Sequence, residues 1–460
     1  MPFTMLESRI FHEMFGDADA AELFSDERVI AYWCRAEVAL AEAESELGVI
    51  PAEAAEAIAR NVRPERVDLA RLSEGTLLVG YPILPLVRLL EEMVGPEAGE
   101  HLHWGATTQD IMDTAVALQL QDLHRMVDDL LAKLGSVLAD RVRTFKSTPM
   151  AGRTHGQQAV PITLGFKFAV WLEEVRRHQE RWREIEGRIG YGELSGAAGT
   201  LASLGSVGLK VRERMCEILG LKTPPISWHS ARDSVAEVAS ALGLVAGTLG
   251  KMAAEVAALQ RNEIAELAEG FLPDRGSSST MPQKRNPITS EAMVAQAAFI
   301  RQQVPLLTYA MTAVHERATG EWQIEWIVLP EVGVMAVGLL KNAISLLEHL
   351  MVDEEAMRRN LALTRGLIVA ERVMMALAPH LGRQAAHEVV YAASAQAIDQ
   401  RRPLADVLGE NEAVTRHFSL SELANFLDPA GYIGNAPEFA EAALHAYEAD
   451  QDRVGKSATP

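Results

Sequence analysis

The chain has 460 residues, of which 48% are apolar and 23% are charged. This length exceeds what one hydrophobic core usually supports, so we expect two or three packed units, and the composition is that of a globular protein rather than a disordered or membrane protein. The formal net charge of −20 and the lack of a basic stripe argue against nonspecific nucleic-acid binding.

The sequence also favours a cytoplasmic protein. Its first residues contain no basic stretch followed by an apolar run, and no segment approaches the ~20 uninterrupted apolar residues of a membrane-spanning helix. Cys34 and Cys216 are too few for a disulfide framework, which suits a reducing compartment. The 13 histidines show neither an HExxH motif nor a Cys/His cluster, so we expect no bound metal ion.

Three segments carry the apolar spacing of long helices. Residues 111–138, 235–259 and 330–350 place apolar side chains in alternating steps of three and four, which is heptad spacing. The third helix is expected to start at Pro330, because proline is tolerated in a first helical turn. In the first helix the predicted seam consists of Val116, Leu120, Leu123, Val127, Leu130, Leu134 and Val137. The pattern leaves open whether these faces pack within one chain or against other subunits.

Glycine and proline cluster between the expected helices and predict loops near 80–105, 190–228 and 268–289. Alternating β-branched runs are absent, so no substantial sheet is expected. After the third long helix the heptads give way to shorter helical pieces. We therefore predict an all-α protein with three helical domains, of which the middle one is a bundle of long helices. The domain ranges are predicted as 1–110, 111–352 and 353–460.

The segment from Gly276 to Pro287, GSSSTMPQKRNP, is small, polar and cationic. A loop rich in glycine and serine offers backbone N–H groups and hydroxyls that can surround an anion, and Lys284 and Arg285 add charge to hold a carboxylate. The same composition is common in surface loops that have no chemical role. The order of the residues separates these two interpretations.

This order resembles the signature of the fumarase/aspartase superfamily, in which a serine lies three residues before a methionine, and lysine and asparagine follow. The resemblance implies that Ser278 is the catalytic base and that Lys284 and Asn286 bind a substrate carboxylate. Glu291 falls where the family has the carboxylate partner of a catalytic histidine. Ser277 departs from the pattern, because the residue before the base is usually glycine.

The segment HWGATTQD, residues 103–110, resembles the first conserved region of the same superfamily. In that region adjacent hydroxyl residues bind a substrate carboxylate, and the resemblance assigns this role to Thr107 and Thr108. Taken alone, two threonines before a helix are also ordinary capping residues, with Asp110 favoured in the first turn by the helix dipole.

The segment GRTHGQQAVP, residues 152–161, resembles the second conserved region. The resemblance implies that Thr154 contacts a carboxylate and that His155 is the general acid, which neutralises the departing group as its bond breaks. A lone histidine is more often structural than catalytic. The predicted partnership of His155 with Glu291 is what favours the catalytic role.

The motif WHSARD, residues 228–233, is similar to one found in the adenylosuccinate lyase and 3-carboxy-cis,cis-muconate cycloisomerase branches, and it implies a carboxylate contact by Arg232. Arg317 is a second candidate contact. The residues after Arg317 lack the serine and arginine that hold a nucleotide phosphate in adenylosuccinate lyases. Bacterial cycloisomerases commonly carry tryptophan where this chain has His155, which counts against a lactonising enzyme.

The resemblance as a whole implies a lyase that needs no cofactor and eliminates a group from a substituted succinate, such as an aspartate-, nitrosuccinate- or N-succinyl-type dicarboxylate. The product would be fumarate or a close analogue, formed through an aci-carboxylate intermediate. The resemblance also implies a homotetramer whose active sites are shared between subunits. A 3-carboxy-cis,cis-muconate cycloisomerase, acting on a tricarboxylate, is the alternative, and a non-enzymatic helical scaffold is the alternative from another class.

Overall fold

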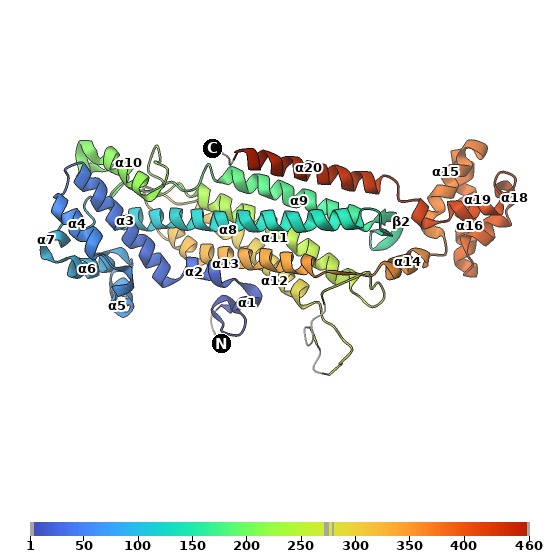
Figure 1. The fold of residues 1–460 in the computed structure, drawn as a ribbon, viewed down its shortest axis with the longest axis horizontal. Coiled ribbons are helices and arrows are strands. Elements are labelled where there is room, and N and C mark those ends of the chain that lie inside the picture. The colour runs from blue at the N-terminus through green and yellow to red at the C-terminus, as the bar shows by residue number, and fades with distance from the viewer. Residues whose placement is uncertain (1–3, 271–275, 278–279, 458–460) are drawn as a thin grey trace. The chain divides into compact units, whose positions relative to one another are not determined.

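The computed structural model describes residues 4–270, 276–277 and 280–457, and its helices confirm the all-α prediction (Figure 1). The first thirteen helices are α1 (His12–Phe15), α2 (Ala18–Leu23), α3 (Asp26–Glu46), α4 (Ala52–Asn61), α5 (Leu69–Val79), α6 (Ile83–Val94), α7 (Pro96–Gly99), α8 (Thr108–Phe145), α9 (Leu164–Ile185), α10 (Gly208–Leu219), α11 (Asp233–Leu259), α12 (Ile288–Ala310) and α13 (Glu321–Glu348). The later ones are α14 (Glu354–Ala362), α15 (Ala370–Leu381), α16 (Arg383–Gln400), α17 (Leu404–Gly409), α18 (Glu412–Thr415), α19 (Leu420–Phe426) and α20 (Ala436–Ser457). Short 3₁₀ helices lie at Met5–Glu7, Pro64–Arg66, Ala202–Val207, Leu367–Val369 and Pro429–Gly431.

Packing divides the chain into two units, each made of three segments, whereas the three sequence domains stay a prediction. The first unit comprises Met1–Leu131, His178–Leu249 and Ala295–Lys341. Within it, α3 packs against α4 and α10. The first unit's parts of α8 and α9 are tied by a reciprocal pair of hydrogen bonds, because the indole N–H of Trp182 donates to the His124 carbonyl and the His124 ring bonds the Trp182 carbonyl.

The second unit comprises Ala132–Arg177, Gly250–Val294 and Asn342–Pro460. Its short helices α15 to α19 enclose a small apolar core of their own. The buried members of that core are Val373, Leu377, Ala386, Val390, Ala393, Ala397, Leu404, Val407, Leu408, Val414 and Leu423. The helix α20 is joined to the second unit's parts of α8 and α9 by ion pairs of Glu448 with Arg143 and of Asp450 with Arg176.

Strands are few among the described residues, as expected. The strands β1 (Pro149–Thr154) and β2 (Gln157–Thr163) form an antiparallel hairpin, and β3 (Leu267–Ala268) pairs with β4 (Met351–Val352). The hairpin was not predicted, because its turn is the pair His155-Gly156 rather than Asn-Gly or Asp-Gly.

The predicted starting point of the third long helix is wrong. The helix α13 begins at Glu321, and Pro330 lies inside it. Proline has no N–H to donate to the carbonyl four residues earlier, so the helix passes Pro330 with one hydrogen bond fewer. The regions 80–105 and 190–228 were expected to be loops, but they contain the helices α6 and α10.

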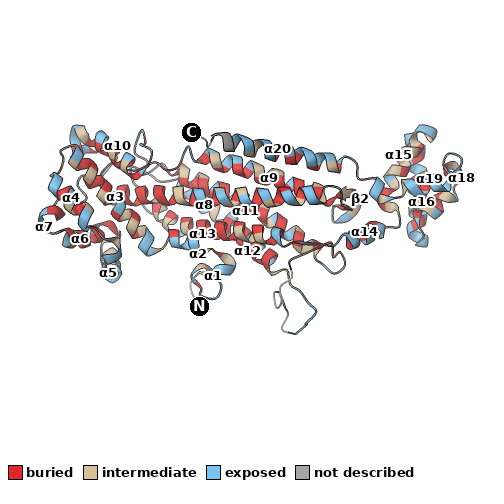
Figure 2. Ribbon diagram, viewed as in Figure 1, coloured by how far each residue is buried: buried red, intermediate tan, exposed pale blue. Residues whose placement is uncertain are grey.

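Among the residues that the structure describes, two helices, α11 and α13, are long and apolar enough to cross a bilayer. The most apolar stretches of α11 and α13 are 50% and 72% buried within the protein. Core helices of soluble proteins can reach the same length and apolar content. Figure 2 shows buried residues along α11, α13 and α8, in keeping with the predicted bundle.

Candidate active site

His155 lies at the tip of the β1–β2 hairpin. Thr154 pairs with Gln157, so His155 and Gly156 form a two-residue turn, with φ of +52° and +76°. Tight hairpin turns require this left-handed backbone, which costs a histidine more than a glycine. The side chains of Thr154 and His155 are both exposed at this tip. A strained residue held out on a tight turn is a common feature of functional sites.

An ion pair to a buried carboxylate anchors the hairpin beside its turn. The Arg153 guanidinium donates to both carboxylate oxygens of Glu266, over 2.8 and 2.7 Å, and Glu266 is completely buried. The Asn360 amide donates to Glu266 Oε1 and to the Ile264 carbonyl, each over 2.8 Å. The two parallel hydrogen bonds between Arg153 and Glu266 restrict both the position and the orientation of the Arg153 side chain, and Asn360 holds Glu266 in place. The turn that carries His155 therefore has a rigid support.

Backbone contacts join the two ends of the segment from Gly276 to Pro287, as far as the structure describes it. The Asn286 N–H donates to the Gly276 carbonyl over 2.8 Å, and a β-bridge joins Ser277 to Arg285. Gly276 has φ of +69°, and a Cβ there would lie 2.5 Å from the Asn286 carbonyl oxygen, so only glycine fits. The Lys284 side chain is exposed. Ser278 lies outside the described residues, so its role as base stays a prediction.

Glu269 fixes the start of α12, which carries Glu291 in its first turn. The Glu269 carboxylate accepts hydrogen bonds from the N–H groups of Thr289 and Ser290 and from the Ser290 hydroxyl, over 3.1, 2.7 and 2.8 Å. Gln260 connects this anchor to the loop, because it accepts from Glu269 N–H and donates to the Arg285 carbonyl. The loop base and Glu291 are therefore held by one continuous set of hydrogen bonds.

In the first unit, Asp110 holds the segment that contains Thr107 and Thr108. Its carboxylate accepts from the N–H groups of Thr107, Ser195 and Gly196, over 2.9, 2.9 and 3.0 Å. Thr108 is the first residue of α8. Asp110 therefore joins the Thr107-Thr108 segment to the loop at 193–196 and fixes the two hydroxyl residues relative to the helix N-terminus.

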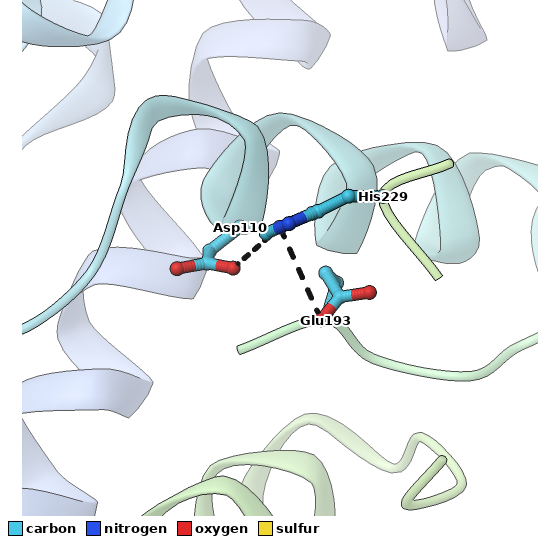
Figure 3. Close-up of side chains that lie close together, drawn as sticks. All are labelled: Asp110, Glu193 and His229. Atoms are coloured by element: carbon cyan, nitrogen blue, oxygen red, sulfur yellow. Dashed lines mark hydrogen bonds and ion pairs between the residues drawn. The ribbon is translucent and has the colours of Figure 1, made fainter. Parts of the chain in front are cut away.

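Figure 3 shows that the His229 ring lies between Asp110 and Glu193. The ring Nε2 is 2.8 Å from Asp110 Oδ1 and 4.0 Å from Glu193 Oε1, and all three side chains are buried. Burial lowers the pKa of His229, but the hydrogen bond to Asp110 and the charges of Asp110, Glu193 and Asp113 raise that pKa above its usual value overall. Burial raises the pKa of Glu193 to about 7. The neighbouring carboxylates therefore offset the effect of burial on the His229 ring.

These three side chains are close enough together to hold a metal ion. However, the Asp110 oxygens already accept three backbone N–H groups, and Glu193 accepts from the Trp228 N–H and the Ser195 hydroxyl. A metal ion would have to replace these hydrogen bonds. The donor set favours a hydrogen-bonded network that supports the Thr107 segment.

Arg232 is buried, and its charge is already paired. The guanidinium bonds both oxygens of Asp113, over 2.8 and 3.0 Å, and both oxygens of Glu325, over 2.8 and 2.5 Å. It also lies 4.9 Å from the centre of the Trp228 ring. The role of Arg232 as a substrate contact stays a prediction, and this geometry favours a structural role.

Arg317 reaches the same network through Gln109. Its Nε donates to Gln109 Oε1 over 3.0 Å, and the Gln109 amide donates to Asp113 and to the His229 carbonyl. The Nη2 atom of Arg317 is buried without a hydrogen-bond partner among the described residues. Arg317 therefore retains a donor for a further group.

The residues predicted for the site that the structure describes fall into two sets. The first unit holds Thr107, Thr108, Arg232 and Arg317, and the second holds Thr154, His155, Lys284, Asn286 and Glu291, while Ser278 lies outside the described residues. Among the described residues, no hydrogen bond joins the side chains of His155 and Glu291, so their pairing stays a prediction. The supporting residues Glu193, Glu266 and Glu269 were missed, because nothing in their sequence surroundings distinguishes them from other acidic residues.

Comparison with known proteins gives the chain a clear set of relatives. A protein-family model described as "Lyase" matches residues 14–301, and one described as "Adenylosuccinate lyase C-terminus" matches residues 366–443. The 3-carboxy-cis,cis-muconate cycloisomerase of Pseudomonas aeruginosa is 42% identical over 96% of this chain and 97% of its own. The N-acetyl-S-(2-succino)cysteine lyase of Dickeya dadantii is 38% identical over 92% of this chain and 93% of its own.

The fold comparison agrees with these sequence matches. The crystal structure of the 3-carboxy-cis,cis-muconate lactonizing enzyme from Pseudomonas putida covers 96% of this chain and 99% of its own, with a TM-score of 0.91 and 37% identity.

Proposed function

Because the chain belongs to the fumarase/aspartase superfamily of lyases, we propose that it eliminates a group from a substituted succinate and releases fumarate or a close analogue. Its closely similar relatives include both a succinyl-adduct lyase and a cycloisomerase. The two reactions share the cleavage or formation of a bond one carbon away from an acidic C–H group. They differ in whether an acid must protonate a departing atom.

The observation that carries the proposal is the placement of His155. An elimination needs an acid beside the leaving group, and the hairpin presents an imidazole on a tight, anchored turn. His155 is exposed in the single chain, so a substrate bound against the hairpin can reach it. The histidine therefore favours elimination over lactonisation at this site.

The proposed reaction begins when the Ser278 alkoxide removes a proton from the carbon next to a carboxylate. The electron pair left on carbon enters that carboxylate, which becomes a doubly charged aci-form. Lys284 and Asn286 would bind this form more tightly than the substrate, because its negative charge is larger. The energy barrier to proton removal falls only if the aci-form is bound more tightly than the substrate.

In the second step the bond to the leaving group breaks, and its electron pair goes to the departing atom. His155 donates a proton to that atom, and Glu291 would orient the ring and stabilise its charged form. Thr107, Thr108 and Thr154 would bind the second carboxylate and so hold the carbon skeleton in position between the base and the acid. The products are fumarate, or its analogue, and the protonated leaving group, so no cofactor is required.

The proposed setting is a cytoplasmic homotetramer in which the Thr107 segment, the His155 hairpin and the Ser278 loop of each site come from different subunits. Proteins of this family are typically oligomeric. Of the predicted site residues that the structure describes, four belong to the first unit and five to the second.

A substrate panel tests the proposal. Purified protein is mixed with aspartate, N-substituted aspartates, an S-succinylated cysteine, nitrosuccinate, malate and 3-carboxy-cis,cis-muconate, and products are followed by proton NMR. Fumarate from at least one succinyl compound supports the proposal. Consumption of 3-carboxy-cis,cis-muconate without fumarate from any other compound would instead support the cycloisomerase.

A further inference from the structure

A cavity of about 370 Å³ lies between α3, α8 and α13 in the first unit. Much of its wall is aromatic and consists of Phe24, Trp33, Trp322 and Trp326. Among the described residues, none of those predicted for the active site lines it. Its size is within the usual range for a site that encloses a small molecule.

The aromatic wall is held rigidly. The rings of Trp322 and Trp326 meet edge to face, with centroids 4.8 Å apart and planes at 81°. Tyr81 supports both rings, with its centroid 6.0 Å from each. The Trp322 indole N–H donates to Asp113 over 3.2 Å, which prevents the ring from rotating. Packing has therefore fixed this part of the wall before any ligand arrives.

The charged part of the wall is acidic. Asp26 and Glu325 line the cavity, and no lysine, arginine or histidine does so among the residues that the structure describes there. Behind Glu325, the guanidinium of Arg232 bonds Asp113 as well as Glu325, so Glu325 shares this cation with a second carboxylate. A further positive group in the cavity would therefore be attracted to Glu325.

We propose that this cavity binds a small organic cation with an apolar body, such as an alkyl- or aryl-substituted ammonium ion. Indole faces attract a cation electrostatically, and the two carboxylates supply the opposite charge. A neutral molecule of the same shape gains only from the burial of its apolar surface, and an anion is repelled. The site does not depend on the proposed elimination, because binding requires no turnover.

The test compares three probes of nearly equal shape and different charge. They are benzyltrimethylammonium, the alcohol 2-methyl-1-phenylpropan-2-ol and the anion 2,2-dimethyl-3-phenylpropanoate, and each is titrated into the whole protein by calorimetry without substrate. The cation should bind about tenfold more tightly than the alcohol, and the anion should not bind measurably. Equal affinities for the cation and the alcohol would overturn the proposal.

Two variants locate the binding. Asp26→Asn and Trp326→Leu should each weaken binding of the cation about fivefold, and Asp26→Asn should leave binding of the alcohol unchanged. Glu27→Gln is the matched control, because Glu27 is an exposed neighbour of Asp26 on α3 that does not line the cavity. Full retention of cation binding in Asp26→Asn and Trp326→Leu, or an equal loss in Glu27→Gln, would place the cation on the acidic surface instead.

Discussion

The guanidinium of Arg232 takes part in four hydrogen bonds to two carboxylates that lie far apart in the sequence, Asp113 on α8 and Glu325 on α13. Burial raises the pKa of Glu325, while the bonds from Arg232 lower it, and the net direction is upward. Arg232 therefore opposes the effect of burial, which by itself favours the neutral form of Glu325. Removal of one partner from such a group leaves an uncompensated buried charge.

Arg232→Lys tests whether this arginine is structural. A lysine can bond only one carboxylate well, so we expect the free energy of unfolding to fall by about 2–4 kcal/mol in urea denaturation. The control is Arg188→Lys in the exposed pair with Glu237, which should change stability by less than about 0.5 kcal/mol. A raised KM with unchanged stability would instead make Arg232 a substrate contact.

Glu44 is a second buried charge, and it has no hydrogen-bond partner among the described residues. Burial, reinforced by the charge of Glu37, raises the pKa of Glu44 from 4.5 to about 9. Between these values the unfolded chain has released the proton and the folded chain keeps it. The folded state therefore binds more protons, and stability falls as the pH rises through this range.

Glu44→Gln removes this pH dependence. The variant should match the parent protein near pH 5 and exceed it by about 2 kcal/mol or more at pH 8, measured by urea denaturation at both values. Glu53→Gln, at an exposed position on α4, serves as the control and should show no such divergence. Parallel stability curves for Glu44→Gln and the parent protein would mean that Glu44 is stabilised by a partner.

At the scale of elements, the β1–β2 hairpin combines a strained turn with a rigid support directly beside it. His155 carries the strain, and the buried bonds of Arg153, Glu266 and Asn360 hold the strands that impose it. Asparagine tolerates a left-handed backbone better than most residues. A substitution by asparagine therefore separates the chemical role of the ring from its conformational cost.

His155→Asn should preserve the melting temperature and lower kcat at least about a hundredfold, because the acid is lost while the turn is kept. His155→Ala should lose a similar factor in kcat and also lose some stability. Activity is measured with the best substrate of the panel. An unchanged kcat in His155→Asn would remove the histidine from the proposed mechanism.

The long helices could be predicted because heptad spacing is a strong local signal, but details of their packing could not. On α8 the predicted seam residues Leu123, Val127 and Leu134 are fully buried. Farther along, Leu130 and Val137 are only half-buried, and the adjacent Leu131 and Leu138 are fully buried instead. A straight helix drifts by about 20° per heptad, so a strict seven-residue pattern departs from the buried stripe.

The supporting residues of the site escaped prediction for a different reason. The order of residues within the motifs identified candidates for catalysis and substrate binding. Asp110, Glu266 and Glu269 act differently, by accepting hydrogen bonds from groups distant in the sequence. Asp110 lies within a recognised motif, but the sequence indicated only an acidic residue that the helix dipole favours in the first turn. Such partnerships depend on tertiary structure, which a single sequence does not display.

At the scale of the whole molecule, the first unit leaves large apolar side chains exposed on its long helices. Leu244 on α11, Tyr309 on α12 and Ile327 on α13 are 53%, 58% and 67% exposed. Apolar surface on core-forming helices favours contact with further subunits. This agrees with the typically oligomeric state of the family.

Mixing two inactive variants tests whether sites are shared between subunits. Thr108→Val and His155→Asn should each be inactive, and a tetramer reassembled from equal amounts of both should regain about a quarter of the parental activity, because some sites then receive both native residues. Analytical ultracentrifugation of the same samples should show four chains. A mixture that stays inactive, or a fully active monomer, would contradict shared sites.

The most direct test of the proposed elimination is the rate of fumarate release by Ser278→Ala, with Ser277→Ala as the matched control on the neighbouring residue. The proposal predicts that Ser278→Ala loses fumarate release by at least about a thousandfold while its melting temperature is unchanged, and that Ser277→Ala retains most of it. Retention of activity in Ser278→Ala would contradict the assignment of this serine as the base and, with it, the proposed mechanism.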